Sequence, residues 1–261
     1  MTKKTYIHGG TDEREVARLE KQARFAWKFI GPKLEIGPGA RVLDLATGVG
    51  AMANQLRLHL PGIRLMGVDL NRAQLDSARR NHPEIPYVNA DGAALPFRDG
   101  TFDHVHCSWL LEHVTEPVRI LREVHRVLRP GGTAWFVEVD NATFRTEPRD
   151  EEIAAVMDVM NETQARGGGD PYVGRKLGQL FLEAGFQHVE LDRMPLHGTH
   201  DDPDNFREIV EEFAEIFESV DEALEPEMAA RARKAADALR ALLHRPGTSM
   251  YYASVFARAV R

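Results

Sequence analysis

The sequence predicts an α/β fold built on a mostly parallel, doubly wound sheet of seven strands, with the last strand antiparallel. Between residues 41 and 139, short apolar runs of strand length alternate with segments of helical periodicity, which is the pattern of a parallel sheet covered by helices on both faces. Near the C-terminus, YYASVFARAV (251–260) alternates like an antiparallel strand. We expect two additions to this sheet, an N-terminal lid helix and a helical cap inserted before the last strand.

Composition narrows the class of protein further. The chain has 261 residues, 43% of them hydrophobic and 28% charged, and no apolar run approaches the ~20 residues of a membrane span. The N-terminal segment lacks an apolar signal core, so we expect a cytoplasmic protein. A net charge of -7 with dispersed basic residues disfavours nucleic acid and membrane as partners. Cys107 is the single cysteine, which excludes an internal disulfide and a cysteine-based zinc cluster.

Helix-capping residues, and the Gly and Pro residues that end helices, predict the bounds of the helices and strands in the first half of the chain. Thr11 is a candidate N-cap, and apolar residues then recur at helical spacing as far as Gly31 and Pro32. Asn71 is a second candidate cap, and Thr115 with Pro117 in the first turn predicts a third helix start. The expected strands are 41–45, 63–70, 87–88, 104–108 and 133–139, and the expected helices between the first three of them are 52–60 and 71–81.

The second half is richer in helix. We expect helices over 151–165 and 174–184, a sixth strand over 186–191, and a helix opening at Asp202 and Pro203. The apolar stripe of this helix consists of Phe206, Ile209, Val210, Phe213, Ile216, Phe217 and Val220. Its other face is acidic, with Glu208, Glu211, Glu212, Glu215 and Glu218. The expected parts are a lid helix (1–32), a cofactor-binding core (33–140), the rest of the core with a short helical insert (141–200), a helical cap (201–246) and the final strand (247–261).

Residues suited to ligand binding follow four successive strands. In an open α/β sheet, ligands bind beyond the carboxyl ends of the strands, near the point where strand order reverses. The segment VLDLATGVG (42–50) reads as a strand entering a glycine turn, where small residues let the backbone approach a nucleotide-like cofactor. The other three strand ends carry Asp69, the run Asp91-Gly92-Ala93, and the run Cys107-Ser108-Trp109. A glycine turn alone is weak evidence, but four coinciding strand ends predict a cofactor site.

These motifs resemble those of the class I S-adenosylmethionine-dependent methyltransferases, in particular the group with the ubiquinone/menaquinone C-methyltransferases and many natural-product methyltransferases. The resemblance is carried by VLDLATGVG, GVDLN, NADGAALPFRDGTFDHVHCSWLLEHV and LREVHRVLRPGGTAWFVEVD, over about residues 38–140. It implies S-adenosylmethionine as cofactor, with Asp69 on the ribose, Leu70 against the adenine, Asp91 and Ala93 at the adenine edge, and the carbonyls of Ala46 and Cys107 facing the methionine amine. Asp44, Thr47, Gly48, Gly50, Gly92 and Ser108 complete the expected cofactor site. Ala46 departs from the usual glycine and makes the turn slightly less permissive.

Catalytic and acceptor-binding residues are harder to assign. His113 lies just past the fourth strand and Glu138 near the fifth, and some sugar O-methyltransferases of the group use a histidine and an acid at similar places, so we take His113 and Glu138 as the catalytic hypothesis. The alternative is that His113 only packs near the cofactor. Acceptor-binding candidates are Trp109, His8, His197 and Phe213. Glu138, Asp140 and Asn141 could suggest a metal, but no matching downstream carboxylate motif supports one, and we predict no metal.

The resulting functional prediction is methyl transfer from S-adenosylmethionine to O, N, S or C of a small, largely apolar metabolite, in secondary metabolism. Two alternatives remain open from the sequence. One is a protein that keeps the cofactor site as a cyclase or regulatory binding module. The other is a nicotinamide-dependent oxidoreductase, which shares the glycine turn and the second-strand acid but is disfavoured by the third acidic loop and the antiparallel last strand. Expected partners are a small-molecule acceptor and a second copy of the chain in a homodimer.

Overall fold

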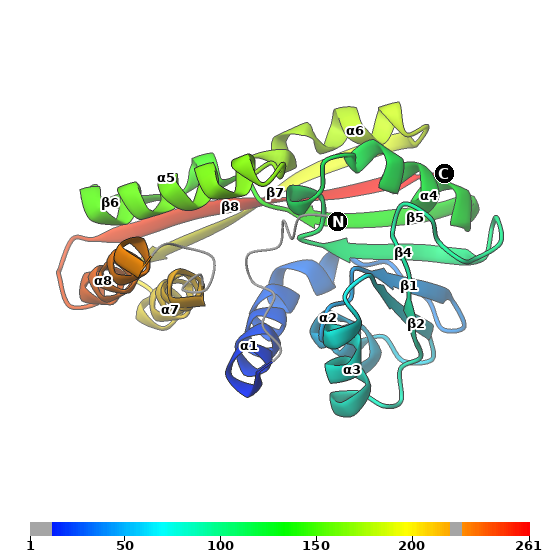
Figure 1. Cartoon of the computed structure of the whole chain (residues 1–261), viewed down its shortest axis with the longest axis horizontal. Helices are drawn as coiled ribbons and strands as arrows, with labels where there is room; N and C mark the ends of the chain where they lie inside the picture. The colour runs from blue at the N-terminus through cyan, green and yellow to red at the C-terminus, as the bar shows by residue number, and fades with distance from the viewer. Residues whose placement is uncertain (1–11, 220–225) are drawn as a thin grey trace.

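A computed structural model describes residues 12–219 and 226–261 of the chain. Over these residues a single eight-stranded sheet forms the centre of the molecule, in the order β3-β2-β1-β4-β5-β8 (Figure 1). β5 and the short β6 lie along one edge of β8, and β7 lies along the other edge. The strands are β1 (Arg41–Leu45), β2 (Arg64–Asp69), β3 (Tyr87–Asn89), β4 (Phe102–Ser108), β5 (Leu128–Glu138), β6 (Arg145–Glu147), β7 (Gln187–Thr199) and β8 (Ser249–Val260).

The parallel part of the sheet has the topology expected from the sequence. β1 pairs in parallel with both β2 and β4, so the strand order reverses between β1 and β4. β8 runs antiparallel to β5 and to β7, as its alternating sequence predicts. The predicted count of seven strands is wrong by one, because β6 pairs with β8 over only three residues, which is too short for a pattern to show in the sequence.

Helices cover both faces of the sheet. α1, α2 and α3 lie on one face, and α4 and α6 lie on the other (Figure 1). The helix bounds are α1 (Glu13–Ile30), α2 (Ala51–His59), α3 (Arg72–Asn81), α4 (Pro117–Val127), α5 (Glu151–Arg166), α6 (Leu177–Glu183), α7 (Pro203–Ser219) and α8 (Pro226–Leu242). Asn71 caps α3 through its side-chain oxygen, as predicted. α1 is capped by Asp12, one residue after the expected position, and the residue before α4 is Glu116 rather than Thr115.

β7 is much longer than the predicted strand over 186–191, whereas β8 begins only two residues before its predicted start at Tyr251. They pair from Gln187 with Val260 to Thr199 with Ser249, and they run on past the parallel strands as a ribbon. α5, α7 and α8 gather around the far end of this ribbon (Figure 1). The second half of β7 was not predicted from the sequence. Most side chains of β7 are exposed, and the second half contains Pro195 and Gly198, which argue against a strand.

Two main hydrophobic cores follow from this arrangement. One lies around the parallel sheet and includes Leu43, Leu121 and Phe181; the other lies in the cap formed by α5, α7, α8 and the ribbon, and includes Phe217 and Leu239. α1 joins the two regions, since Phe25 packs in the cap core while Ile30 packs with residues of α2 and β5. The expected lid helix is therefore an integral wall, and we expect its removal to expose both regions.

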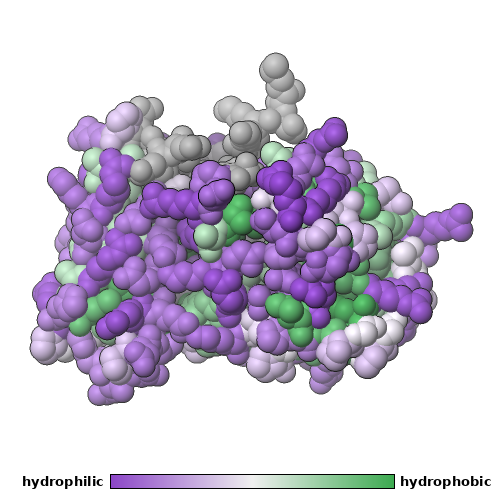
Figure 2. Space-filling view, turned by 90° about the horizontal axis from the view of Figure 1, so that it is seen from below, coloured by the Kyte–Doolittle hydropathy of each residue, from purple (hydrophilic) through white to green (hydrophobic). Residues whose placement is uncertain are grey.

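The face shown in Figure 2 is mostly hydrophilic, with apolar side chains in small separate patches. Within residues 12–219 and 226–261, no helix has the length and hydropathy needed to cross a membrane.

Candidate active site

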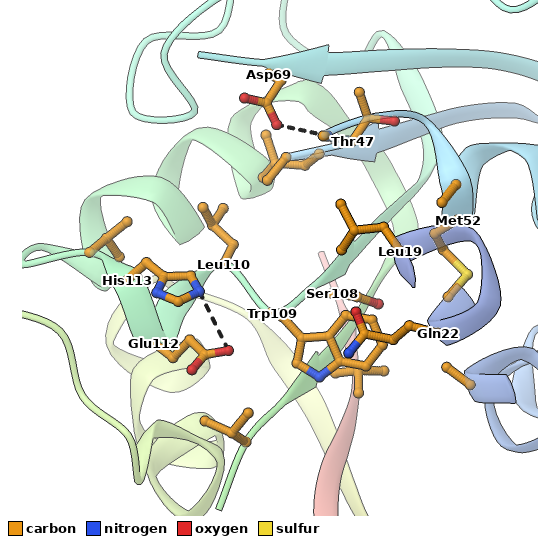
Figure 3. A pocket seen from close by; sticks show the side chains of 18 of the residues that line it. Leu19, Gln22, Thr47, Met52, Asp69, Ser108, Trp109, Leu110, Glu112 and His113 are labelled. Carbon is orange, nitrogen blue, oxygen red and sulfur yellow. Dashed lines mark hydrogen bonds and ion pairs between the residues drawn. The ribbon is translucent and has the colours of Figure 1, made fainter. Parts of the chain in front are cut away.

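A cavity of about 1160 Å³ opens at the carboxyl ends of β1, β2 and β4. This is the edge where the strand order reverses, which is the position expected for a ligand in such a sheet. Ligand pockets commonly have volumes of about 300 to 1,000 Å³, so this cavity has room for more than one small molecule. Figure 3 shows its walls, with Asp69 and Thr47 near the sheet, Leu19 and Gln22 from α1, and His113 and Glu112 on the opposite side.

The turn after β1 is built from residues in left-handed conformation. Gly48 has φ of 56° and Gly50 has φ of 82°, values that glycine adopts without strain. A side chain at Gly50 would also meet the Tyr87 hydroxyl at 2.6 Å, so Gly50 shapes the turn although it does not line the cavity. Ala46 has φ of 56°, which a residue with a side chain tolerates only at a cost. The departure from glycine noted in the sequence therefore falls on a strained position.

Asp69 at the end of β2 connects this turn to the next strand. Its carboxylate accepts the backbone N–H of Gly48 at 2.8 Å and that of Asn71 at 2.7 Å. Burial raises the pKa of Asp69, and these two amides partly offset the rise. Leu70 beside it lines the cavity with 67% of its surface exposed, which is unusual for leucine and suits a side chain that packs on a ligand.

The loop after β3 brings the third expected group to the same cavity. Asp91, Gly92 and Ala93 all line it. The Asp91 carboxylate accepts the backbone N–H of Ala93 at 2.8 Å, which holds the loop in a turn.

The end of β4 adds a buried hydrogen-bonded line that the sequence analysis missed. Nδ1 of His106 lies 2.7 Å from Asp44, whose other oxygen accepts the Thr47 hydroxyl at 2.6 Å. Ser108 Oγ lies 3.2 Å from Nε2 of His106. Because a carboxylate only accepts hydrogen bonds, Nδ1 carries the proton toward Asp44 and Nε2 can accept one from Ser108. Alternation in HVHCS could have shown that His106 shares a strand face with Ser108.

Cys107 lies between these two residues but faces the other way. Its side chain is part of the sheet core and does not line the cavity, and burial raises the pKa of its thiol. Only its backbone carbonyl was expected at the cofactor, and a strand residue can present its carbonyl there while its side chain is buried elsewhere.

The structure separates the expected catalytic pair. Glu138 is fully buried at the end of β5, where its carboxylate accepts the backbone N–H groups of Leu110, Leu111 and Glu112. It braces the turn that carries His113 and does not line the cavity. The hypothesis of a His113–Glu138 pair is therefore not met by the geometry.

His113 does line the cavity, next to a different acid. Its Nε2 lies 3.6 Å from the Glu112 carboxylate, and its Nδ1 lies 3.4 Å from the Gln164 side-chain amide (Figure 3 shows the Glu112 contact). Burial lowers the pKa of His113, so its imidazole is neutral near pH 7.

The acceptor-binding candidates fall in different places. Trp109 and Phe213 line the cavity, and Trp109 has φ of 56°, a strained backbone at the cavity wall. His197 was expected in a flexible segment, but it lies on β7 with its ring against Tyr251 and outside the cavity lining. His8 lies outside the described residues.

Glu212 on α7 is a correction to the expected acidic outer face. It lines the cavity and is only 5% exposed, whereas the sequence pattern predicts it on the acidic face opposite the apolar stripe. The signal was present in the spacing, because Glu212 lies three residues after Ile209 and four before Ile216, on the apolar side of the helix.

The N-terminus of α2 provides a site for an anion. Its N-cap is Gly50, and no side chain caps the helix, while Ala51 and Met52 of the first turn line the cavity. Uncapped N–H groups at a helix start attract a negative group such as a carboxylate. With the carboxylate of Asp69, the exposed Leu70 and the Asp91 loop, this end of the cavity has the donors, acceptors and apolar surface that fit S-adenosylmethionine.

Metal binding has no support in the geometry. In the described part of the chain, no three His, Cys, Asp or Glu side chains gather in a way that could hold a metal ion. Asp140 is instead paired with Arg175 and Arg193, and Glu138 with backbone amides.

Comparison with known proteins agrees with this site. Residues 43–136 match the family model described as a methyltransferase domain. Over these residues the chain is thus similar to class I S-adenosylmethionine-dependent methyltransferase domains. Within that class it is similar to the demethylmenaquinone methyltransferase of Thermus thermophilus, with 40% identity over 119 residues, which cover 44% of this chain and 54% of that protein.

The fold of nearly the whole chain is similar to that of solved structures. Phosphoethanolamine N-methyltransferase 2 of Haemonchus contortus, solved with phosphomonomethylethanolamine and S-adenosylhomocysteine, superposes with a TM-score of 0.59 at 19% identity, covering 92% of this chain and 52% of that one. The [4+2]-cyclase SpnF superposes with a TM-score of 0.57 at 20% identity, covering 92% and 80%. These likenesses concern the fold alone. The chain spans about half the length of the curated relatives it matches.

Proposed function

We propose that the chain transfers the methyl group of S-adenosylmethionine to a small, largely apolar acceptor. The observation that carries the proposal is one cavity shared by the four predicted strand ends and by an apolar wall from α5 and α7. When bound, the cofactor supplies a sulfonium methyl group, which is electrophilic without further activation. The chain then has to bind, align the acceptor and exclude water.

The cofactor end of the cavity consists of residues from the sheet. Asp69 would accept the ribose hydroxyls, Leu70 would cover the adenine, and Asp91 with Ala93 would meet the adenine edge. The start of α2 would hold the carboxylate. These roles follow the family resemblance and are supported by the position of each residue in the lining.

The acceptor end is bounded by α1, α5, α7 and the ribbon. Met157, Met160, Phe213 and Leu196 give it an apolar wall, and methionine side chains adapt to varied shapes. This supports a small apolar acceptor and disfavours a nucleic acid. Secondary metabolism, a cytoplasmic location and a homodimer remain predictions.

Two groups can take a proton from a hydroxyl acceptor. His113 is the residue expected from the sequence, but both of its ring nitrogens face protein partners, Glu112 and Gln164. Ser108 lines the cavity and continues through His106 to Asp44 at hydrogen-bond distances. We infer that Ser108 contacts the acceptor, that His106 holds its proton, and that Asp44 stabilises the charged imidazole.

The test is formation of S-adenosylhomocysteine from S-adenosylmethionine with a panel of small apolar acceptors. Cofactor-dependent thermal stabilisation is measured alongside, because a ligand that binds only the folded state raises its apparent stability. We expect stabilisation by S-adenosylhomocysteine and none by NAD. Stabilisation by NAD alone would replace the methyltransferase proposal with an oxidoreductase. Stabilisation by S-adenosylhomocysteine without turnover across the panel would favour the cyclase or binding-module alternative.

A further inference from the structure

Glu212 is a buried carboxylate that the fold itself does not use. It is 5% exposed, and neither of its oxygens has a donor in good hydrogen-bonding geometry among the described residues, although Gln22 lies close enough to lower its pKa. A buried ionisable group without a partner costs free energy, so such a group in a cavity wall calls for a ligand. Burial raises the pKa of Glu212 to about 7, which shows how poorly its surroundings compensate the charge.

The cations nearest to Glu212 are already committed to other acids. Arg18 forms two hydrogen bonds with Glu15, at 2.7 and 2.8 Å, and Lys21 pairs with Glu215 at 2.6 Å. Each positive charge on this part of α1 thus has its own carboxylate. Arg18 and Lys21 lower the pKa of Glu212 through space, but their hydrogen bonds go to Glu15 and Glu215, and the carboxylate of Glu212 is compensated only in part.

The charges of the side chains that line the cavity also favour a positively charged ligand. Six carboxylates line it, from Asp44, Asp69, Asp91, Glu112, Glu116 and Glu212, against the two guanidinium groups of Arg18 and Arg119 among the described residues. The balance disfavours an anionic acceptor and favours a cationic one. The wall around Glu212 combines the apolar Phe213 and Ile216 on the same helix with the polar Arg18 and Gln22 on α1.

We propose that Glu212 binds a protonated amine of the methyl acceptor, and that the acceptor is therefore an apolar amine. This inference rests on the proposed methyl-transfer function, and it names the class of substrate for the same site. Glu212 acts as an anchoring and specificity-determining residue, because an ammonium group supplies both the hydrogen-bond donors and the positive charge that the carboxylate lacks. The apolar wall of α5 and α7 then covers the rest of the acceptor.

The experiment measures binding of matched probes in the presence of saturating S-adenosylhomocysteine. Tryptamine, tryptophol and indole-3-acetate share a ring and differ in the terminal group, and 4-phenylbenzylamine with its alcohol provides a second scaffold. We expect the wild-type protein to bind each amine at least about tenfold more tightly than its alcohol, and the carboxylate least tightly. Glu212→Gln, which keeps the shape of the side chain, should remove the preference by weakening only the amines.

The matched control is Glu211→Gln, on the same helix but outside the cavity lining, where Glu211 accepts a hydrogen bond from Arg240. It should leave the preference for amines unchanged. Equal or tighter binding of the alcohols, absence of amine binding on both scaffolds, or a preference that survives Glu212→Gln would each overturn the inference. If S-adenosylhomocysteine itself fails to stabilise the wild-type protein, the proposed function falls as well, so the two failures are distinguishable.

Discussion

The cofactor end and the cap of this molecule differ in how their sequences specify structure. The cofactor end lies within residues 43–136, which match a family model, and its turns carry motifs in which single residues have assigned positions. The cap of α5, α7, α8 and the distal ribbon contains no such motif, and its residues are selected mainly for burial in a second core. We infer that the cofactor constrains the sequence of the first region, while the acceptor constrains the second.

The largest effect should come from deleting cap core. Phe217→Ala removes a fully buried ring, and we expect the free energy of unfolding to fall by about 3 to 5 kcal/mol. Urea denaturation measures this loss. S-adenosylhomocysteine affinity, measured by calorimetry, should stay within about twofold of the wild type. Leu121→Ala in the sheet core is the control for a similar loss of packing. A large loss of cofactor affinity in the cap variant would show that the two regions are not separable.

Removing the proton route should affect turnover almost as strongly. Ser108→Ala removes the hydroxyl that lies 3.2 Å from Nε2 of His106, and for a hydroxyl acceptor we expect kcat to fall at least about 100-fold with little change in cofactor affinity. His113→Asn should cost about tenfold, through altered contacts in the wall. The reverse order of effects would return the catalytic role to His113.

A smaller loss of cofactor affinity is expected when the carboxylate of Asp69, which would bind the ribose, is neutralised. Asp69→Asn keeps the shape of the side chain but weakens charged hydrogen bonds, so S-adenosylhomocysteine affinity should fall about 10- to 100-fold. Phe213→Ala in the cap should leave that affinity nearly unchanged and weaken only the acceptor. Equal losses of cofactor affinity in both variants would contradict the division of the cavity.

Titration of Glu212 in the cap and of His104 in the sheet should change the free energy of unfolding in opposite directions as the pH rises. Glu212 has its pKa raised to about 7 by burial, opposed by Arg18, Gln22 and Lys21 and assisted by Glu215. Its unfolded state loses the proton first, so the stability present below pH ~4.5 declines by about 2 to 3 kcal/mol as the pH rises to about 7. Glu212→Gln should abolish this decline in urea denaturation series, and a slope that persists in the variant would exclude Glu212 as its source.

His104 in the sheet acts in the other direction. Burial, with a smaller contribution from the charges of Arg129 and Arg258, lowers the pKa of His104 to about 4 against the opposing charge of Asp103. The unfolded state gains a proton first as the pH falls below ~6.5, so stability is lost between there and about pH 4. Because the ring is partly exposed, the loss should be only about 1 kcal/mol, and His104→Gln should remove it.

The smallest effect is expected at Ala46. Replacing it with glycine relieves the left-handed backbone but increases the freedom of the unfolded chain, so we expect stabilisation of at most about 1 kcal/mol. Ala17→Gly, on the exposed side of α1, should instead destabilise the protein by about 1 kcal/mol. Thermal denaturation of the two variants distinguishes relief of strain from the general cost of glycine. Destabilisation of both would mean that Ala46 is not strained.

The same contrast explains what the sequence could predict. Asp69, Asp91 and the turn after β1 could be placed in one cavity because their spacing on parallel strands brings their ends to one edge. β7 beyond Leu191 could not be foreseen, since its exposed face and Pro195 hide the strand, and its pairing with β8 is a long-range contact. Glu212 was misplaced because its charge grouped it with the acidic face, although its helical position lay among apolar residues. His113 and Glu138 were adjacent only in the order of the strands, and the direction of each side chain had to come from the structure.

The ribbon of β7 and β8 has one more consequence. Both strands pass without interruption from the sheet into the cap, and rotation of the cap about a hinge would have to break their ladder of backbone hydrogen bonds. The distance from the cofactor turn to the acceptor wall is therefore set by strand length, at about 3.3 Å for each residue. Inserting a matched pair of residues in each strand would move the wall outward by about 7 Å. We expect the length of the ribbon to determine the size of the acceptor end of the cavity. A change in this length would alter the size of the acceptor that fits, while the cofactor turn stays the same.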